Sequence, residues 1–120
     1  MTKRILVVED QEDNRQILRD LLGSVGYDII EAGDGEEAVR LAELRPDLIL
    51  MDIQLPGLDG YEATRRIKAD ARLRDIPIIV VTSYALSGDE DKARAAGCDA
   101  YVTKPYSPRH LLAKIREFLP

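Results

Sequence analysis

The stretch LILMDIQLPGLDG, residues 48–60, is the most informative part of this chain for predicting its fold. Its first four residues are all apolar and have the length of a strand that is buried on both faces, as in a parallel sheet covered by helices. Asp52 follows them directly, and a Pro-Gly loop comes next. Open α/β sheets bind ligands at the carboxyl ends of their strands. The stretch therefore predicts a carboxylate at the ligand-binding edge of a parallel sheet.

Four further strands are predicted around this one, at residues 4–8, 27–31, 78–81 and 100–103. Between and after the strands, apolar residues recur at three- and four-residue spacing, which is typical of a helix with one buried face. The helices are expected from the polar residues after Asp10 to about Ser24, from Asp34-Gly35 to Pro46, from Asp59 or Gly60 through Lys68, from Ser87 or Asp89 to Gly97, and from Ser107-Pro108 to Leu119.

The predicted helices differ in how much apolar surface they carry. The first and last have full inner faces, namely Ile17, Leu18, Leu21, Leu22 and Val25, and Leu111, Leu112, Ile115, Phe118 and Leu119. The fourth offers little beyond Ala93, Ala95 and Ala96. Because few apolar contacts hold it, we expect the fourth helix to be a mobile, lightly anchored element.

Strictly alternating strands and helices predict an α/β fold with right-handed crossovers. We expect residues 1–120 to form one doubly wound (βα)5 domain, with a five-stranded parallel sheet in the flavodoxin-like order 2-1-3-4-5 and helices on both faces. In that order the first and third strands are neighbours. Glu9 and Asp10, which end the first strand, then lie beside Asp52.

The composition narrows the class of protein. A net charge of −5 and a pI near 4.9 argue against a nucleic-acid surface. The single cysteine, Cys98, excludes an internal disulfide and fits a reducing compartment. No apolar stretch has the length of a membrane span, and no signal peptide is present. We expect a cytoplasmic protein that contacts neither membrane nor nucleic acid directly.

Polar residues at the strand ends indicate phosphoryl transfer. Three converging carboxylates would repel one another, and a hard divalent cation such as Mg²⁺ would relieve that repulsion. A carboxylate such as Asp52 can attack a phosphoryl group, and the charge that develops needs a metal, a cation and a hydroxyl donor. Mg²⁺ on Asp10 and Asp52, with Glu9 acting through water, would supply the metal. Lys104 and Thr82 would supply the ammonium and the hydroxyl.

Several other polar residues receive a structural interpretation. Glu12, Asp13 and Asn14 could shape the metal pocket, but a helix-capping role is favoured. His110 is interpreted as a partly solvated helix residue. The chain has no phosphate-binding P-loop, no GxGxxG and no HExxH, so nucleotide hydrolysis, dinucleotide binding and zinc proteolysis lack their motifs.

Four stretches together resemble the receiver domain of a two-component response regulator, over the whole length of the chain. They are ILVVEDQEDN (5–14), DLILMDIQLPGLDGYEATRRI (47–67), IPIIVVTSYA (76–85) and GCDAYVTKPYSPRHLLAKI (97–115). The stretch SGDEDKARAAGCDAYVTKPYSPRHLL (87–112) is most similar to single-domain regulators of the DivK type. A chain that ends at Pro120 also fits a single-domain regulator.

The resemblance implies a phosphoacceptor signalling switch rather than an enzyme with a substrate of its own. It implies that Asp52 receives phosphate from a sensor histidine kinase or a histidine phosphotransfer protein. Glu9, Asp10, Asp52 and the backbone carbonyl of Gln54 would hold Mg²⁺. Many receivers have Asp where this chain has Glu9, and we expect this to change the metal geometry only slightly.

The resemblance also implies how the switch works. Lys104 would contact the phosphoryl group and precede a cis peptide bond to Pro105. Thr82 and Tyr101 would form the switch pair and remodel the face made by the fourth helix, fifth strand and fifth helix, which a downstream protein partner reads. Tyr84, two residues past Thr82, is expected to slow attack by water on the phosphoryl group.

Three alternatives remain open from the sequence. A haloacid-dehalogenase-type phosphatase also uses a strand-end Asp with Mg²⁺, but it requires a second Asp where this chain has Gln54, and usually a cap domain. A pseudo-receiver would serve only as an interaction module. A receiver domain cut from a hybrid kinase or a DNA-binding regulator would show the same sequence pattern.

Overall fold

The computed structural model describes residues 2–82 and 89–120. Within them lies a parallel sheet in the order β2-β1-β3-β4-β5. Its strands are β1 (Arg4–Val8), β2 (Asp28–Ala32), β3 (Leu48–Asp52), β4 (Ile78–Thr82) and β5 (Ala100–Thr103). The helices are α1 (Glu12–Ser24), α2 (Gly35–Leu41), α3 (Gly60–Ala69), α4 (Asp89–Ala96) and α5 (Pro108–Arg116), and a 3₁₀ turn, Ala42–Leu44, follows α2.

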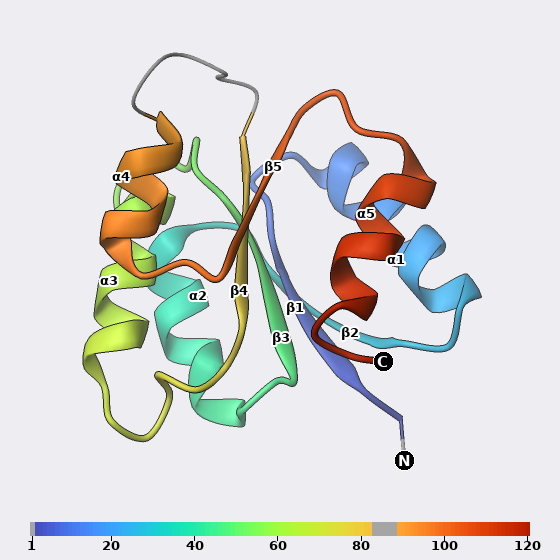
Figure 1. Cartoon of the computed structure of the whole chain (residues 1–120). Helices are drawn as coiled ribbons and strands as arrows, with labels where there is room; N and C mark the ends of the chain where they lie inside the picture. Colours follow the sequence, from blue (N-terminus) through green and yellow to red (C-terminus); the bar gives the residue numbers. More distant parts are fainter. Residues whose placement is uncertain (1, 83–88) are drawn as a thin grey trace.

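The helices cover the sheet on two sides. Figure 1 shows α1 and α5 on one side and α2, α3 and α4 on the other, which we call the α1/α5 face and the α2–α4 face of the sheet. Strand order and layering confirm the predicted doubly wound α/β fold. The predictions for Tyr84 and for a helix start at Ser87 lie outside the described residues.

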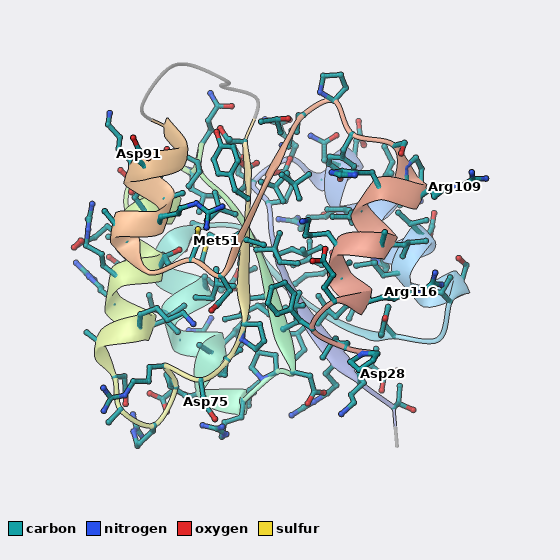
Figure 2. All side chains as sticks on the ribbon, viewed as in Figure 1. Asp28, Met51, Asp75, Asp91, Arg109 and Arg116 are labelled. Carbon is teal, nitrogen blue, oxygen red and sulfur yellow. The ribbon has the colours of Figure 1, made fainter. Side chains whose placement is uncertain are left out.

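Each strand divides its side chains between two separate cores, because neighbouring residues of a strand point to opposite faces. In β3, Leu48 and Leu50 join the core beneath α1 and α5. Ile49 and Met51 join the core beneath α2, α3 and α4, and Figure 2 shows Met51 among the side chains on that face. All five residues of β3 are buried. The continuous apolar run that predicted a doubly covered strand is thus confirmed.

Side chains cap three of the helices at the predicted residues. Asp34 accepts a hydrogen bond from the backbone N–H of Glu37, and Asp59 accepts one from the N–H of Glu62. Ser107 accepts from the N–H of His110, with proline next in the chain. Each cap satisfies an N–H that has no partner inside its helix, and so fixes where the helix begins.

Several sequence-based details were wrong. The second strand begins at Asp28, one residue late, because the backbone N–H of Tyr27 bonds to Leu22 at the end of α1. Val25 follows α1 and is 40 % exposed, and Ile17 is 63 % exposed because a cavity, described below, lies beside it. The last helix ends at Arg116, so the buried Leu119 packs from the turn that follows.

Lys68 makes hydrogen bonds and an ion pair that connect three segments at the end of the sheet opposite to Asp52. Its Nζ donates to the backbone carbonyls of Arg74 and Ile76 at 3.0 and 2.9 Å. It also pairs at 2.8 Å with the carboxylate of Asp99, which itself accepts from the backbone N–H of Ile78. This side chain therefore joins α3 to the start of β4 and to the turn between α4 and β5.

Among the described residues, no helix is both long enough and apolar enough to cross a membrane.

Candidate functional site

The pairing of β1 with β3 places Glu9 beside Asp52. Val8 pairs with Met51, so Glu9 and Asp52 are the next residues of the two strands. The residues two positions earlier, Val7 and Leu50, belong to the core beneath α1 and α5. Because side chains two residues apart on a strand point to the same face, Glu9 and Asp52 point to this face as well. Register and alternation together therefore bring the two acidic side chains to one side of the sheet edge.

Asp52 is held at both of its oxygens. The side chain is buried, with 6 % of the residue exposed. Its Oδ1 accepts a hydrogen bond from the backbone N–H of Gln54 at 3.0 Å, and its Oδ2 accepts one from Lys104 Nζ at 3.1 Å. A cation and an amide thus orient the carboxylate, and hydrogen bonds to charged groups are stronger than neutral ones.

Gly60 lets α3 begin directly against the end of β3. A Cβ at this position would lie only 2.2 Å from the carbonyl oxygen of Asp52. The N–H of Gly60 donates to the carbonyl of Ile53 at 3.2 Å. A larger residue would push the loop after Asp52 outward, so glycine is required by the close approach of two backbone segments.

Glu9, Asp10 and Asp52 form an acidic cluster whose ligand oxygens all lie within 4.8 Å of one another. Glu9 is buried and Asp10 is exposed. Burial, followed by the neighbouring Asp52 carboxyl, raises the pKa of Glu9 from 4.5 to about 7. Several carboxylate oxygens at this spacing form the donor set that a hard divalent cation such as Mg²⁺ takes.

Lys104 reaches the cluster from the end of β5. Its Nζ lies 3.1 Å from Asp52 Oδ2 and 3.9 Å from Glu9 Oε2, so its closer partner is Asp52. Its backbone N–H donates to the carbonyl of Thr82 at 2.7 Å. The bond from Lys104 to Pro105 is cis, as expected from the sequence.

Thr82 and Tyr101 lie on the opposite face of the sheet from Asp52. Thr82 is fully buried at the end of β4, and Tyr101 is partly buried on β5 against the core beneath α2, α3 and α4. The pairing of Tyr101 with Val80, two residues before Thr82, puts both side chains on the α2–α4 face. The structure thus brings Glu9, Asp10, Asp52 and Lys104 together and places Thr82 and Tyr101 across the sheet.

The role favoured for Asn14 was wrong. Its side-chain amide donates to Glu9 Oε1 at 2.7 Å instead of capping α1. The next residue, Arg15, donates from Nη1 to the backbone carbonyl of Glu9 at 2.9 Å. Sequence reasoning missed Arg15 altogether. The only available signal was that both residues lie within the first turn of the helix that follows the acidic strand end.

A cavity of about 650 Å³ lies beside the carboxylates on the α1/α5 face. Charged and apolar residues from several elements line it: Val8, Glu9, Asn14, Ile17, Leu18, Leu21, Leu50, Asp52, Val81, Lys104, Pro105, Tyr106 and Pro108. Burial, followed by the negative charges of Glu9 and Asp52, raises the pKa of the Tyr106 phenol. Asp52 therefore borders a space lined by charged side chains and by a larger number of apolar ones.

Comparison with known proteins assigns this arrangement to a family. The model of the response regulator receiver domain matches residues 5–116. The chain belongs to the response regulator receiver family. As a receiver it is a regulatory phosphoacceptor of two-component systems rather than an enzyme in the usual sense.

Relatives of this receiver match it end to end. The polar-differentiation response regulator DivK of Brucella ovis is 48% identical over 120 residues, which cover 99% of this chain and 98% of the relative. The crystal structure of the receiver domain of sensor histidine kinase PA1611 from Pseudomonas aeruginosa is 41% identical, with a TM-score of 0.91 and coverage of 99% and 98% of the two chains. That structure has a magnesium ion coordinated in its active site cleft.

A more distant receiver shares the same fold. The chemotaxis protein CheY4 of Vibrio cholerae is 26% identical, with a TM-score of 0.92 and coverage of 98% of this chain and 99% of that one. Similar structures thus include the receiver of a sensor kinase as well as a chemotaxis regulator. The phosphatase alternative is set aside by this family membership.

Proposed function

We propose that Asp52 is the phosphoacceptor of this receiver and takes its phosphoryl group from a phosphohistidine of a sensor histidine kinase or histidine phosphotransfer protein. The observation that carries the proposal is the pairing of Asp52 with Lys104 beside two further carboxylates. The Asp52 carboxylate is buried, oriented at both oxygens, and borders a cavity on the α1/α5 face.

In the transfer step, an oxygen of Asp52 forms a bond to phosphorus while the bond from phosphorus to the histidine nitrogen breaks. The electron pair of the broken bond stays on the imidazole ring. Lys104 Nζ, 3.1 Å from Asp52 Oδ2, is placed to contact the oxygens of the arriving group. Positioning and charge neutralisation are the main contributions that a protein makes to phosphoryl transfer.

We assign the cation site to Glu9, Asp10, Asp52 and the backbone carbonyl of Gln54. The acidic cluster supports this assignment, and so does the magnesium ion in the similar receiver of PA1611. Bound Mg²⁺ would neutralise the negative charge that builds up on the phosphoryl oxygens. Asp10 is the exposed member and faces solvent, whereas Glu9 and Asp52 are buried.

Phosphorylation would then act across the sheet. A phosphoryl group adds negative charge and acceptor oxygens at Asp52. Thr82 would turn to donate its hydroxyl to one of these oxygens, and Tyr101 would move inward into the vacated space. The resulting change in the surface of α4, β5 and α5 would be read by a downstream protein partner.

We propose that residues 1–120 act as one receiver domain whose partners are proteins and which does not bind nucleic acid directly. The cytoplasmic location expected from the sequence remains a prediction.

The proposal is tested by labelling the protein with a radioactive phosphohistidine donor or acetyl phosphate in the presence of Mg²⁺. We expect Asp52→Asn to abolish labelling, because an amide cannot attack phosphorus as a carboxylate does. Asp13→Asn is the matched control, since Asp13 is exposed on α1 and should leave labelling unchanged. Label that persists on folded Asp52→Asn protein would overturn the assignment.

A further inference from the structure

We propose that Asn14 is a positioning residue that holds the Glu9 carboxylate in the geometry the cation site requires. This inference rests on the proposed Mg²⁺ site and adds a residue that the acidic cluster does not include. Asn14 belongs to the first turn of α1, and its amide Nδ2 lies 2.7 Å from Glu9 Oε1. The contact joins an uncharged donor to a buried carboxylate.

The backbone of Glu9 is already fixed on both sides, so only its side chain is left to be oriented. Its N–H donates to the carbonyl of Ala32 at 3.0 Å. Its own carbonyl accepts from Arg15 Nη1 at 2.9 Å. Asn14 and Arg15, which are adjacent in sequence, therefore hold the side chain and the main chain of the same residue.

A glutamate needs such a partner more than an aspartate would. It has one more methylene group, about 1.5 Å of extra reach, and one more rotatable bond whose freedom must be lost on binding a cation. Lys104 does not provide the restraint, because its Nζ lies 3.9 Å from Glu9 Oε2 and bonds to Asp52 at 3.1 Å. The amide of Asn14 engages Oε1 and leaves Oε2 directed toward the Lys104 and Asp52 side of the site.

Residues that orient a metal ligand through a hydrogen bond commonly change metal affinity by about 10- to 100-fold when they are removed. We expect Asn14→Ala to weaken Mg²⁺ binding by roughly tenfold. Asn14→Gln retains the amide and should restore part of the affinity.

The decisive test is a double-mutant cycle read out by calorimetric titration of the whole protein with MgCl₂ at pH 8. In Glu9→Asp the shorter carboxylate should fall out of reach of Asn14. Adding Asn14→Ala to that variant should therefore change Mg²⁺ affinity by less than about twofold. A purely structural role of Asn14 would instead produce the same loss in both backgrounds.

Controls separate this inference from the proposed function. Gln16→Ala, an exposed position on the same helix, should leave Mg²⁺ affinity unchanged, and urea unfolding should confirm that each variant folds. Failure of the unsubstituted protein to bind Mg²⁺ would overturn the proposed cation site itself. Normal binding by Asn14→Ala, or an equal loss with Glu9 and with Asp at that position, would overturn only the role of Asn14.

Discussion

Glu9 and Asp52 end neighbouring strands, yet their surroundings give them different chemistry. Asp52 has the ammonium of Lys104 at 3.1 Å, whereas the hydrogen bond that Glu9 receives from Asn14 comes from a neutral amide. Burial and the nearby Asp52 carboxyl raise the pKa of Glu9 to about 7. Without a cation, therefore, Glu9 still carries a proton at pH values at which an exposed glutamate has lost it.

This difference predicts a pH dependence of Mg²⁺ binding. Below about pH 7 the cation must displace the proton on Glu9, so its affinity should fall roughly tenfold for each further pH unit. Calorimetric titrations between pH 5.5 and 8.5 would measure the effect. Glu9→Gln, which has no proton to displace there, should bind more weakly at pH 8 but show a flatter profile. An equal affinity of the unsubstituted protein at pH 5.5 and pH 8 would contradict the prediction.

The raised pKa of Glu9 also makes the stability of the folded domain depend on pH in the absence of the cation. Because the pKa of Glu9 is higher in the folded chain than in the unfolded chain, its protonated form favours folding. That contribution is complete below the usual value of 4.5 and is lost as the pH rises through about 7. Bound Mg²⁺ would favour the deprotonated form of Glu9 and would so oppose this loss of stability.

The helix α4 is held by a small apolar face and by polar contacts of the turn that follows it. The helix buries the small side chains of Ala93 and Ala96. The turn that follows it carries Asp99, which Lys68 of α3 holds at 2.8 Å. Asp99 in turn accepts from the backbone N–H of Ile78, so α4 is tied to both α3 and β4 through this turn.

We expect Lys68→Met to destabilise the domain by about 1–3 kcal/mol, because two backbone carbonyls and the Asp99 carboxylate lose a charged donor. Methionine keeps most of the length and apolar contact of the side chain. Urea unfolding measures the change in free energy, and Lys92→Met at an exposed position of α4 is the matched control. Equal stabilities of the two variants would show that the Lys68 contacts contribute nothing.

The elements themselves could be predicted from the sequence because their signals are local. Continuous apolar runs marked the strands, and Asp59 and Ser107 marked two helix starts through their own backbone contacts. Ile17 was misplaced because its exposure depends on a cavity that also involves the loop after β5. Asn14 was misread for a related reason, since the orientation of one amide toward Glu9 is fixed by tertiary structure and not by helix periodicity.

The sheet separates the proposed phosphoacceptor from the proposed switch residues. Asp52 borders the cavity on the α1/α5 face, whereas Thr82 and Tyr101 lie on the α2–α4 face. Asp52 pairs with Val81, the residue before Thr82, so the two residues end neighbouring strands at the carboxyl edge of the sheet. A change at Asp52 would reach Thr82 at this edge.

We expect phosphorylation of Asp52 to shift the backbone amide resonances of Tyr101 and of α4. Phosphorylation of Thr82→Ala should leave the amide resonances of α4 largely unshifted, because no hydroxyl is present to donate to the phosphoryl group. Thr82→Ser, which retains the hydroxyl, is the matched control. Two-dimensional NMR spectra with and without phosphorylation provide the measurement. A full α4 response in phosphorylated Thr82→Ala would show that the signal does not depend on Thr82.

The alternation of side chains along β3 and β4 separates the proposed phosphorylation site from α4. Asp52, which would receive the phosphoryl group, lies on one face of the sheet. Thr82 and Tyr101, which would respond to it, lie on the other face. A protein that delivers phosphate at the cavity and a protein that contacts only α4 would therefore use different faces of the sheet. A partner that extends onto α5 would share the α1/α5 face with the donor, because Pro108 of α5 also lines the cavity.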